Sequence, residues 1–569
     1  KFEEQRAWFR EHLGKVAGII GADNLEGDFV NRVIRLETKI AQMTMKKDQA
    51  RQFDQYFTVT TLDDLIADVN KMSYLKAKDA NYTENVVDAA DGDKDLLTVP
   101  ENPAGADDIA MMAKFWEKLF GEMRLREVMA ANYAQNYPEN TNAAEAQYRM
   151  MVFDGDYFRR ILRLLFRKSN RLDVKAYLQY RVITSAKEFC TKELNEEYFD
   201  FYGRKLGGQK AQKTPEKRTT GLVNSWMGEL MGKIYVSRFF SEEDKRTVHG
   251  MVKEVVEIMK ISLTNNDWLT KETKEKAMLK LSKFVVKLGY PDKWKSFGDL
   301  VLTPSDSLFA MHCKVAAFEH KTEFLEKVNS IKDETKWEMN PQDVNAYFHP
   351  LNNEIVFPAA IMQPPFYQRS LDAADFDIGV SRDVPNLLAA INFGGIGAVI
   401  AHEITHGYDD QGRKFDSDGN INDWWQEEDT QLFKGKCAYM AAQAETWTFE
   451  DKPENGEGEV KVHRMNGDLT MGENLADLGG LSLACQALKK QCGDAMGKEQ
   501  YTAFFRSWAN VWKSKETEAF VIQALTTDPH APPSFRGNIV KNIDAFHETF
   551  DVKEGDAMYL PEEKRVRMW

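Results

Sequence analysis

The sequence predicts a mainly α-helical protein with more than one domain, and three observations support this. Its 569 residues are too many for a single hydrophobic core. Apolar residues recur at three- and four-residue spacing over long stretches, which is the pattern of amphipathic helices. Hydrophobic residues make up 43% and charged residues 29% of the chain, as in ordinary globular proteins.

The first 325 residues are predicted to be mostly helical. The main helical patterns run over residues 2–12, 29–45, 62–75, 157–166, 174–194, 222–239, 242–264 and 271–288. The acidic, turn-rich stretch 88–108 is predicted to be a loop. The basic stretch 204–218, which contains Gly207 and Gly208, is also predicted to be an exposed loop.

The pattern changes near Trp337. Residues 344–347 and 354–358 are β-prone and bounded by turns, so we expect two edge strands there. The later elements are predicted as helices at 387–408, from about Gly472 onward, and around Trp508 and Trp512, with a proline-rich loop at 529–533.

Charge and cysteine content exclude several classes of protein. The net charge of -14 argues against nucleic acid as the main partner. No apolar run approaches the ~20 residues of a membrane helix, so no transmembrane segment is predicted. The few cysteines include no C-x-x-C pair, which argues against a disulfide framework and a cysteine zinc site. No signal peptide is visible at Lys1, so this end leaves the compartment open.

Residues 402–406 form the motif H-E-x-x-H within a predicted helix. His402 and His406 are four residues apart and lie one above the other on a helix, so both imidazoles can bind one metal ion. Glu403 lies beside the first ligand, where its carboxylate can reach a metal-bound water. The alternative is a helix with two surface histidines.

A catalytic zinc site needs a third protein ligand and an open position. The pattern H-E-x-x-H-x-x-G-x-x-H is excluded, because Asp409 stands where it needs glycine and Gly412 where it needs histidine. A glutamate from a second helix is the other common solution. Glu427 and Glu428 are candidates, but they lie among charged residues, as at an exposed helix start.

Glu473 is the better candidate for the third ligand. Glu473 and Asp477 are also four residues apart, so their carboxylates share one helix face. This pairing suits a zinc ligand and a second carboxylate that holds a ligand histidine in one tautomer. By itself, the pattern would favour a capped amphipathic helix, but beside H-E-x-x-H it favours the metal site.

These motifs together resemble the neprilysin family of zinc endopeptidases, which includes endothelin-converting enzymes and bacterial oligopeptidase O. The matching segments are 402–410, 472–477, 345–347, 355–359, 363–366, 423–425 and Trp569. The resemblance is strong from about Asn345 to the end. It is weaker but continuous upstream, for example at 223–228.

The resemblance implies two mainly α-helical lobes that enclose a large cavity, with a small β-sheet in a thermolysin-like catalytic lobe. We assign residues 1–325 to a helical cap lobe and 326–569 to the zinc-binding catalytic domain. Part of 220–245 is expected to pack with the catalytic domain. The enclosed cavity implies oligopeptide substrates, because folded proteins cannot enter it.

The resemblance also implies roles for individual residues. His402, His406 and Glu473 would bind one Zn²⁺ per chain. Glu403 would be the general base that activates the zinc-bound water and passes its proton to the leaving amine. Asp477 would orient a ligand histidine.

Further roles concern the substrate. His530 would hydrogen-bond the oxyanion, with Asp528 behind it, and Arg536 would hold a substrate carbonyl. Asn345 and Ala346 would pair with the substrate backbone. An apolar pocket beyond the scissile bond, which implies cleavage on the amino side of hydrophobic residues, would be formed by Ile361, Phe366, Val399 and Trp512.

The low cysteine content resembles bacterial members, as does Val566 where animal members carry a cysteine. We therefore expect an extracytoplasmic bacterial protein, with a cytoplasmic location as the alternative. Two other functions stay open at this point: a thermolysin-like protease that uses Glu427 or Glu428, and a non-catalytic peptide-binding surface protein. The latter would have no need of Glu403. The sequence does not distinguish an enzyme that cleaves within peptides from one that releases dipeptides.

Overall fold

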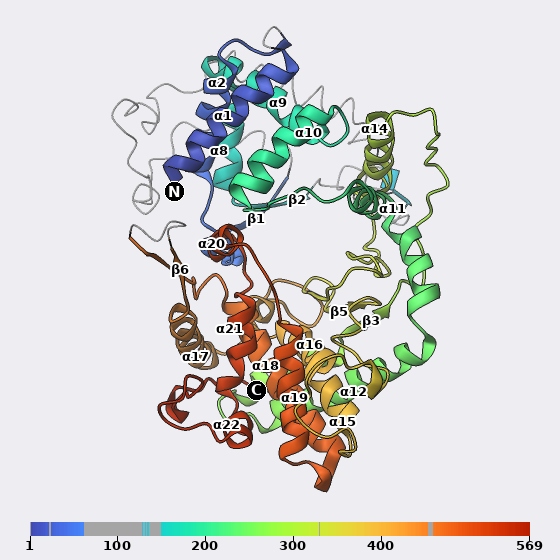
Figure 1. The fold of residues 1–569 in the computed structure, drawn as a ribbon, viewed down its shortest axis with the longest axis vertical. Helices are drawn as coiled ribbons and strands as arrows, with labels where there is room; N and C mark the ends of the chain where they lie inside the picture. The colour runs from blue at the N-terminus through green and yellow to red at the C-terminus, as the bar shows by residue number, and fades with distance from the viewer. Residues whose placement is uncertain are drawn as a thin grey trace. The chain divides into compact units, whose positions relative to one another are not determined.

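The computed structural model describes residues 2–21, 24–61, 149–328, 330–452 and 459–569, together with 128, 131, 132, 134 and 135 (Figure 1). The predicted helix at 62–75 and loop at 88–108 lie outside them. The described part is mainly α-helical with small β-sheets, as predicted. Two compact units are present: unit 1 comprises 1–212 and 296–333, and unit 2 comprises 213–295 and 334–569.

This division differs from the predicted single boundary after residue 325, because residues 213–295 belong to unit 2. Helix α12 (Glu242–Asn265) gives the physical reason. Its residues Val248 and Val255 are fully buried in the same hydrophobic core as Ile400 and Ile404 of the H-E-x-x-H helix. The segment 220–245, which was expected to pack with the catalytic domain, lies within unit 2.

Unit 1 has its own core, formed by residues such as Leu13, Val16, Val33, Ala176 and Tyr180. Its helices are α1 (Phe2–Ile20), α2 (Phe29–Met43), α3 (Lys47–Ala50), α4 (Phe53–Tyr56), α8 (Gly155–Phe166), η5 (Lys168–Asn170), α9 (Arg171–Ala186), α10 (Lys192–Tyr198), η6 (Phe199–Leu206), α14 (Leu308–Glu319) and η7 (His320–Leu325). Its strands β1 (Phe57–Thr61) and β2 (Arg149–Phe153) pair antiparallel.

The predicted loop at 204–218 is shorter in the structure. The π-helix η6 runs to Leu206, and α11 (Pro215–Phe239) begins at Pro215. Thr214 caps α11 by accepting a hydrogen bond from the backbone N–H of Lys217, and proline suits the first helical position because its fixed φ matches the helix. The basic side chains therefore lie partly on helices.

Unit 2 contains a sheet in the order β3-β5-β4. Strand β5 (Glu354–Pro358) is fully buried and pairs parallel with β3 (Val285–Gly289) and antiparallel with β4 (Tyr347–His349). The predicted helix at 271–288 is wrong at its end, because α13 (Lys271–Ser282) stops before β3. The β-branched pair Val285 and Val286 favours the strand once β5 offers a partner.

The remaining elements of unit 2 surround the H-E-x-x-H helix. They are η8 (Leu371–Ala373), α15 (Leu387–Asn392), η9 (Phe393–Gly397), α16 (Ala398–His406), η10 (Gly412–Lys414), α17 (Glu427–Glu445), β6 (Thr448–Asp451), β7 (Lys461–Arg464), α18 (Met471–Cys492), η11 (Gly493–Ala495), α19 (Lys498–Val511), α20 (Glu518–Thr527), α21 (Pro533–Asn538), η12 (Ile539–Asn542), α22 (Asp544–Phe550) and η13 (Glu562–Lys564).

The predicted helix at 387–408 consists of α15, the π-helical segment η9 and α16. Its glycines permit close backbone contact: a Cβ on Gly394 would lie 2.1 Å from the Phe504 carbonyl oxygen, and one on Gly395 would lie 2.2 Å from that of Phe366. By length and composition Leu387–His406 could cross a membrane, but 83% of its apolar 18-residue window is buried inside the protein. Its apolar character therefore serves the core.

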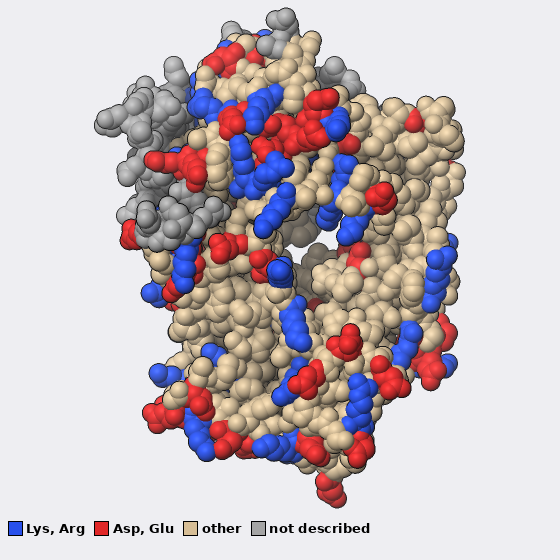
Figure 2. Space-filling model, viewed as in Figure 1, with Lys and Arg blue, Asp and Glu red and all other residues tan. Residues whose placement is uncertain are grey.

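Helix α16 packs along α18 in the centre of unit 2 (Figure 1). Gly479 and Gly480 of α18 make this possible, because a Cβ at these positions would lie 2.5 Å from Thr405 Oγ1 and 2.7 Å from the Ala398 carbonyl oxygen. On the face drawn in Figure 2, basic and acidic side chains are interspersed, so the net charge of -14 is not gathered into one patch there.

Candidate metal centre

The close packing of α16 on α18 brings three potential metal ligands together. His402 and His406 project from α16, and Glu473 projects from the first turn of α18. The two Nε2 atoms are 2.9 Å apart. Glu473 Oε2 lies 3.3 Å from Nε2 of His402, and Oε1 lies 3.7 Å from Nε2 of His406. Among the described residues, this is the group of three whose ligand atoms converge.

A carboxylate anchors the far side of each imidazole. Nδ1 of His402 lies 2.9 Å from Oδ1 of Asp477, and Nδ1 of His406 lies 2.7 Å from Oδ2 of Asp409. An ionised carboxylate only accepts hydrogen bonds, so each Nδ1 carries the proton and donates it. Each Nε2 is then left with a lone pair, as in the imidazoles that bind metals.

The charge of this cluster fits a bound cation. The lone pairs of the two Nε2 atoms face each other and the Glu473 carboxylate. These three groups repel one another unless a positive charge lies between them. Burial alone would lower the pKa of His402 and His406, but the carboxylates of Asp477, Glu473 and Asp409 raise it. Glu473 Oε2 is buried and makes no hydrogen bond within the described chain. The donor set therefore suits a divalent metal.

The spacing of the donors also fits zinc. Two ligand atoms at usual zinc distances and a tetrahedral angle lie about 3.3 Å apart. The observed separations of 2.9, 3.3 and 3.7 Å lie around this value. Two imidazoles and one carboxylate are a donor set of catalytic zinc sites, which keep a fourth position open.

Glu403 follows His402 on α16 and is only 5% exposed. It forms no hydrogen bond or ion pair with other residues that the structure describes, so its carboxylate is available to a ligand. Burial raises the pKa of Glu403, although the two histidines oppose this shift. A carboxylate with a raised pKa is a stronger base than one in water.

His530 lies in the loop between α20 and α21, and its side chain is 50% exposed. Asp528 Oδ1 accepts hydrogen bonds from the His530 backbone N–H at 2.9 Å and from Nδ1 at 2.8 Å. Nε2 lies 3.4 Å from Oε1 of Glu473. The proline-rich loop thus brings His530 to the metal ligands, and Asp528 fixes its ring.

Arg536 of α21 is buried against Asp477. Its Nε and Nη2 donate to Oδ2 and Oδ1 of Asp477, both at 2.7 Å. Its guanidinium also lies 3.9 Å from the centre of the Trp512 ring. Asp477 therefore joins His402 to Arg536, and burial, which would raise the Asp477 pKa, is overcome by this guanidinium. Both N–H groups of Nη1 and the second N–H of Nη2 remain for a substrate carbonyl.

The other predicted substrate-binding residues also belong to unit 2. Asn345 is exposed and Ala346 is buried, and both precede the edge strand β4. The apolar residues Ile361, Phe366, Val399 and Trp512 belong to the core that surrounds α16 or pack against it. The carbonyl of Phe366 accepts a hydrogen bond from the Ile396 N–H at 2.7 Å, which ties this residue to the H-E-x-x-H segment.

Glu427 and Glu428 do not take part in the centre. Both are exposed in the first turn of α17, where Glu427 accepts a hydrogen bond from Gln431. Sequence reasoning instead missed Asp409, the carboxylate on the second histidine. Its signal was the spacing of three residues after His406, which places it one turn further along the chain.

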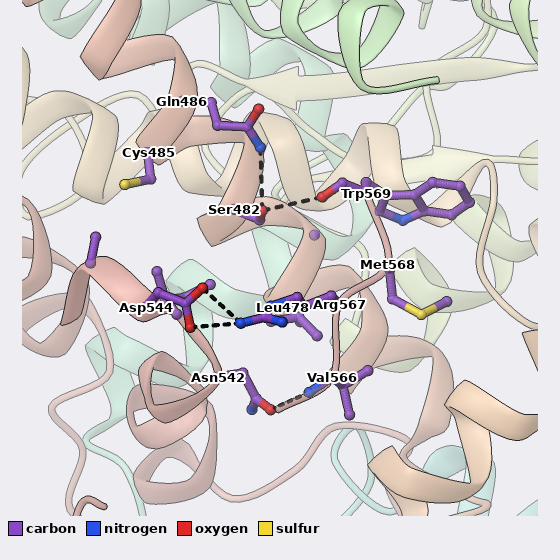
Figure 3. Close-up of a pocket in the computed structure, with 13 residues that line it drawn as sticks. Leu478, Ser482, Cys485, Gln486, Asn542, Asp544, Val566, Arg567, Met568 and Trp569 are labelled. Carbon is purple, nitrogen blue, oxygen red and sulfur yellow. Dashed lines mark hydrogen bonds and ion pairs between the residues drawn. The ribbon is translucent and has the colours of Figure 1, made fainter. Parts of the chain in front are cut away.

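A separate pocket of about 260 Å³ lies beside another face of α18 (Figure 3). Its polar groups satisfy one another. Arg567 pairs with Asp544, and Ser482 lies between the side chain of Gln486 and the backbone oxygen of Trp569. None of the predicted site residues lines it.

Comparisons with known sequences are consistent with this centre. Two models of peptidase family M13 match the chain, over residues 1–291 and 345–566. A neutral endopeptidase of Lactococcus lactis is 34% identical over 422 residues, which cover 74% of this chain and 62% of the relative. Endothelin-converting enzyme 1 of Bos taurus is 29% identical over 439 residues, which cover 74% of this chain and 54% of the relative. The chain thus spans less than two thirds of these curated relatives.

Solved structures show the same fold. The crystal structure of Mycobacterium tuberculosis zinc metalloprotease Zmp1 in complex with an inhibitor matches with a TM-score of 0.76 and 30% identity, over 100% of this chain and 75% of that chain. PepO from Lactobacillus rhamnosis HN001 matches with a TM-score of 0.75 and 24% identity, over 100% of this chain and 75% of that chain.

Proposed function

Because the chain belongs to peptidase family M13, we propose that it is a zinc-dependent endopeptidase that hydrolyses oligopeptides. The observation that carries this proposal is the convergence of His402, His406 and Glu473 beside the unpaired, buried carboxylate of Glu403. The two histidines and Glu473 would hold the zinc. A metal centre that served only the fold would be closed by four protein ligands and would not need Glu403.

Zinc at this position would lower the pKa of a bound water toward ~7 and polarise the scissile carbonyl. Glu403 takes a proton from the attacking water and then delivers it to the leaving amine. Its buried position next to His402 on α16 supports this role. General acid–base catalysis of this kind contributes roughly 10²–10⁴-fold to a rate.

His530 supports the carbonyl oxygen as negative charge develops on it. Asp528 accepts the Nδ1 proton, so Nε2 can donate a hydrogen bond only when the ring is protonated. Nε2 of His530 lies 3.4 Å from Oε1 of Glu473, so this edge of the ring faces the metal ligands. A hydrogen bond from Nε2 would stabilise the oxyanion as it forms.

The substrate is proposed to lie along β4. This strand is at the edge of its sheet, so its free side can pair with an extended peptide, with Asn345 and Ala346 at its start. Ile361, Phe366, Val399 and Trp512 would bind the side chain that follows the scissile bond. This supports cleavage on the amino side of hydrophobic residues.

Four matched glutamate variants test the proposal. Zinc per chain is measured by atomic spectrometry, and hydrolysis is measured with a quenched fluorogenic oligopeptide. Glu403→Gln is expected to retain zinc and to lose activity by roughly 10²–10⁴-fold. Glu473→Gln is expected to lose both zinc and activity, whereas Glu427→Gln and Glu428→Gln keep both.

Each rival function gives a different result. Loss of zinc in Glu427→Gln or Glu428→Gln, with zinc retained in Glu473→Gln, would support the thermolysin-like arrangement. A wild-type protein that binds zinc and the peptide but never cleaves it would be a binding protein. Normal turnover in Glu403→Gln would contradict the role of this residue.

A further inference from the structure

Lys280 of α13 is a fully buried amine that has no carboxylate partner among the residues that the structure describes. Its side chain is 0% exposed, and it forms no ion pair with residues that the structure describes. Its Nζ instead donates to the carbonyl oxygens of Gly412 at 2.7 Å and Phe415 at 2.8 Å. Burial lowers the pKa of Lys280 to about 7, against the attraction of Asp409 and Asp416. Burying an amine costs free energy of folding unless its N–H groups are hydrogen-bonded, so these two carbonyls stabilise it.

The carbonyls that Lys280 binds belong to the turn that follows the second histidine. The N–H of Gly412 donates to Oδ1 of Asp409 at 2.7 Å, and Oδ2 of the same carboxylate accepts from His406 at 2.7 Å. A Cβ on Gly412 would lie 1.7 Å from the His406 carbonyl oxygen. The peptide of Gly412 is thus pressed against the end of α16, and no side chain fits between them.

One continuous set of contacts therefore leads from Lys280 to the metal centre. Lys280 holds the carbonyl of Gly412, the N–H of Gly412 holds Asp409, and Asp409 holds the ring of His406. Tyr408 adds a second link, because its hydroxyl donates to the Ala277 carbonyl on α13 at 2.9 Å. Helix α13 thus holds both ends of the turn.

We infer that Lys280 is a positioning residue for His406, which it orients through the turn 409–415 and the carboxylate of Asp409. The inference rests on the proposed zinc site. Groups hydrogen-bonded directly to a metal ligand, as Asp409 is to His406, typically contribute 10–100-fold to metal affinity, and Lys280 acts on that direct partner. The Lys280 amine makes no hydrogen bond to the proposed metal ligands. Besides the two carbonyls, it lies 5.6 Å from the centre of the Phe348 ring and 5.8 Å from that of the Tyr408 ring, so its hydrogen-bonded path to His406 runs through the turn.

The test measures the zinc affinity of the full chain by competition with a chromogenic chelator. Lys280→Met, which has a similar shape without the amine, is expected to weaken zinc binding by about tenfold, the lower end of the range for direct partners of a metal ligand. Lys283→Met is the matched control. Lys283 follows the same helix and contacts the same loop through Asp418 at 2.7 Å, but it is 42% exposed, so its affinity is expected to stay within twofold of wild type.

A double-mutant cycle separates positioning from general stability. If Lys280 acts through Asp409, the pair Lys280→Met and Asp409→Asn weakens zinc binding little more than the stronger single variant. Leu281→Ala, at the neighbouring buried position, lowers the melting temperature of the metal-free protein but leaves zinc affinity near wild type.

Unchanged zinc affinity in Lys280→Met, or losses that simply add in the double variant, would overturn the inference. Should Lys280→Met not fold, Lys280→Gln replaces it, since an amide keeps N–H donors for the turn without the charge; we then expect a loss between those of wild type and Asp409→Asn. A wild-type chain that binds no zinc would instead overturn the proposed function. A wild-type chain that binds zinc but hydrolyses no peptide would contradict the proposed function alone, because the effect of Lys280 is measured as zinc affinity.

Discussion

At the scale of single residues, each imidazole of the centre has its own carboxylate, and the two carboxylates are held differently. Asp477 is fixed by the Arg536 guanidinium, whereas Asp409 accepts the backbone N–H groups of Gln411 and Gly412. One anchor therefore depends on a side chain of a distant helix and the other on the local turn. His530 has the same design, with Asp528 two residues away.

His530→Ala should lower kcat by roughly 10²–10³-fold and change KM much less, because its hydrogen bond forms as the oxyanion develops. Steady-state kinetics on a fluorogenic peptide measure this split. His249→Ala, at an exposed position of α12, is the control and should behave as wild type. A His530→Ala variant that changed KM alone would assign this residue to ground-state binding.

At the scale of elements, the centre depends on how closely α16 approaches α18. The carboxylates of Glu473 and Asp477 on α18 can reach the two histidines on α16 only because Gly479 and Gly480 leave room for α16. At Gly480 the atoms in the way belong to the backbone of α16 and cannot rotate aside. The distance between α16 and α18 thus sets the distances between the proposed metal ligands.

Gly480→Ala should therefore separate the two helices. We expect a loss of about 1–3 kcal/mol in the free energy of unfolding, as for other overpacked cores, together with weaker zinc binding. Denaturant unfolding and chelator competition measure the two effects. Gly435→Ala on α17 is the control: a Cβ there meets nothing within 4 Å, so alanine should be neutral or stabilise the helix by roughly 0.5–1 kcal/mol. A Gly480→Ala protein with unchanged zinc affinity would contradict this coupling.

At the scale of the whole molecule, the two units have separate hydrophobic cores. All three proposed zinc ligands and their anchors lie in unit 2. Unit 1 supplies none of them among the described residues. Metal binding is therefore coupled to the folding of unit 2.

Removal of the metal should weaken unit 2 selectively. A ligand at 1,000 times its Kd stabilises the folded state by about 4.1 kcal/mol, so chelation removes about this much. Hydrogen exchange with and without chelator should show faster exchange in α16 and α18, with α2 and α9 unchanged. Equal acceleration in both units would mean that they unfold together. Replacing the zinc should restore the original rates, which excludes irreversible damage.

Much of this site could be predicted because it depends on the spacing of residues close together in the sequence. Residues four apart share one face of a helix, as His402 and His406 do, and likewise Glu473 and Asp477. The mainly helical class follows from the same periodicity of apolar residues. His530 and Arg536 were found only through the resemblance, since a histidine in a proline-rich loop has no local signature. Asp409 was within reach of sequence reasoning, from its place one turn after His406.

The sequence by itself therefore determined the ligand types, their pairing along each helix and the mainly α-helical class. Only the tertiary structure decided that residues 213–295 belong with the catalytic unit, that 285–289 is a strand, and that Lys280 lies under the turn of Asp409. The physical reason is the separation along the chain between the groups that interact. Helix faces follow from bonds between near neighbours, whereas a strand needs a partner and a buried amine needs carbonyls that come from far along the chain.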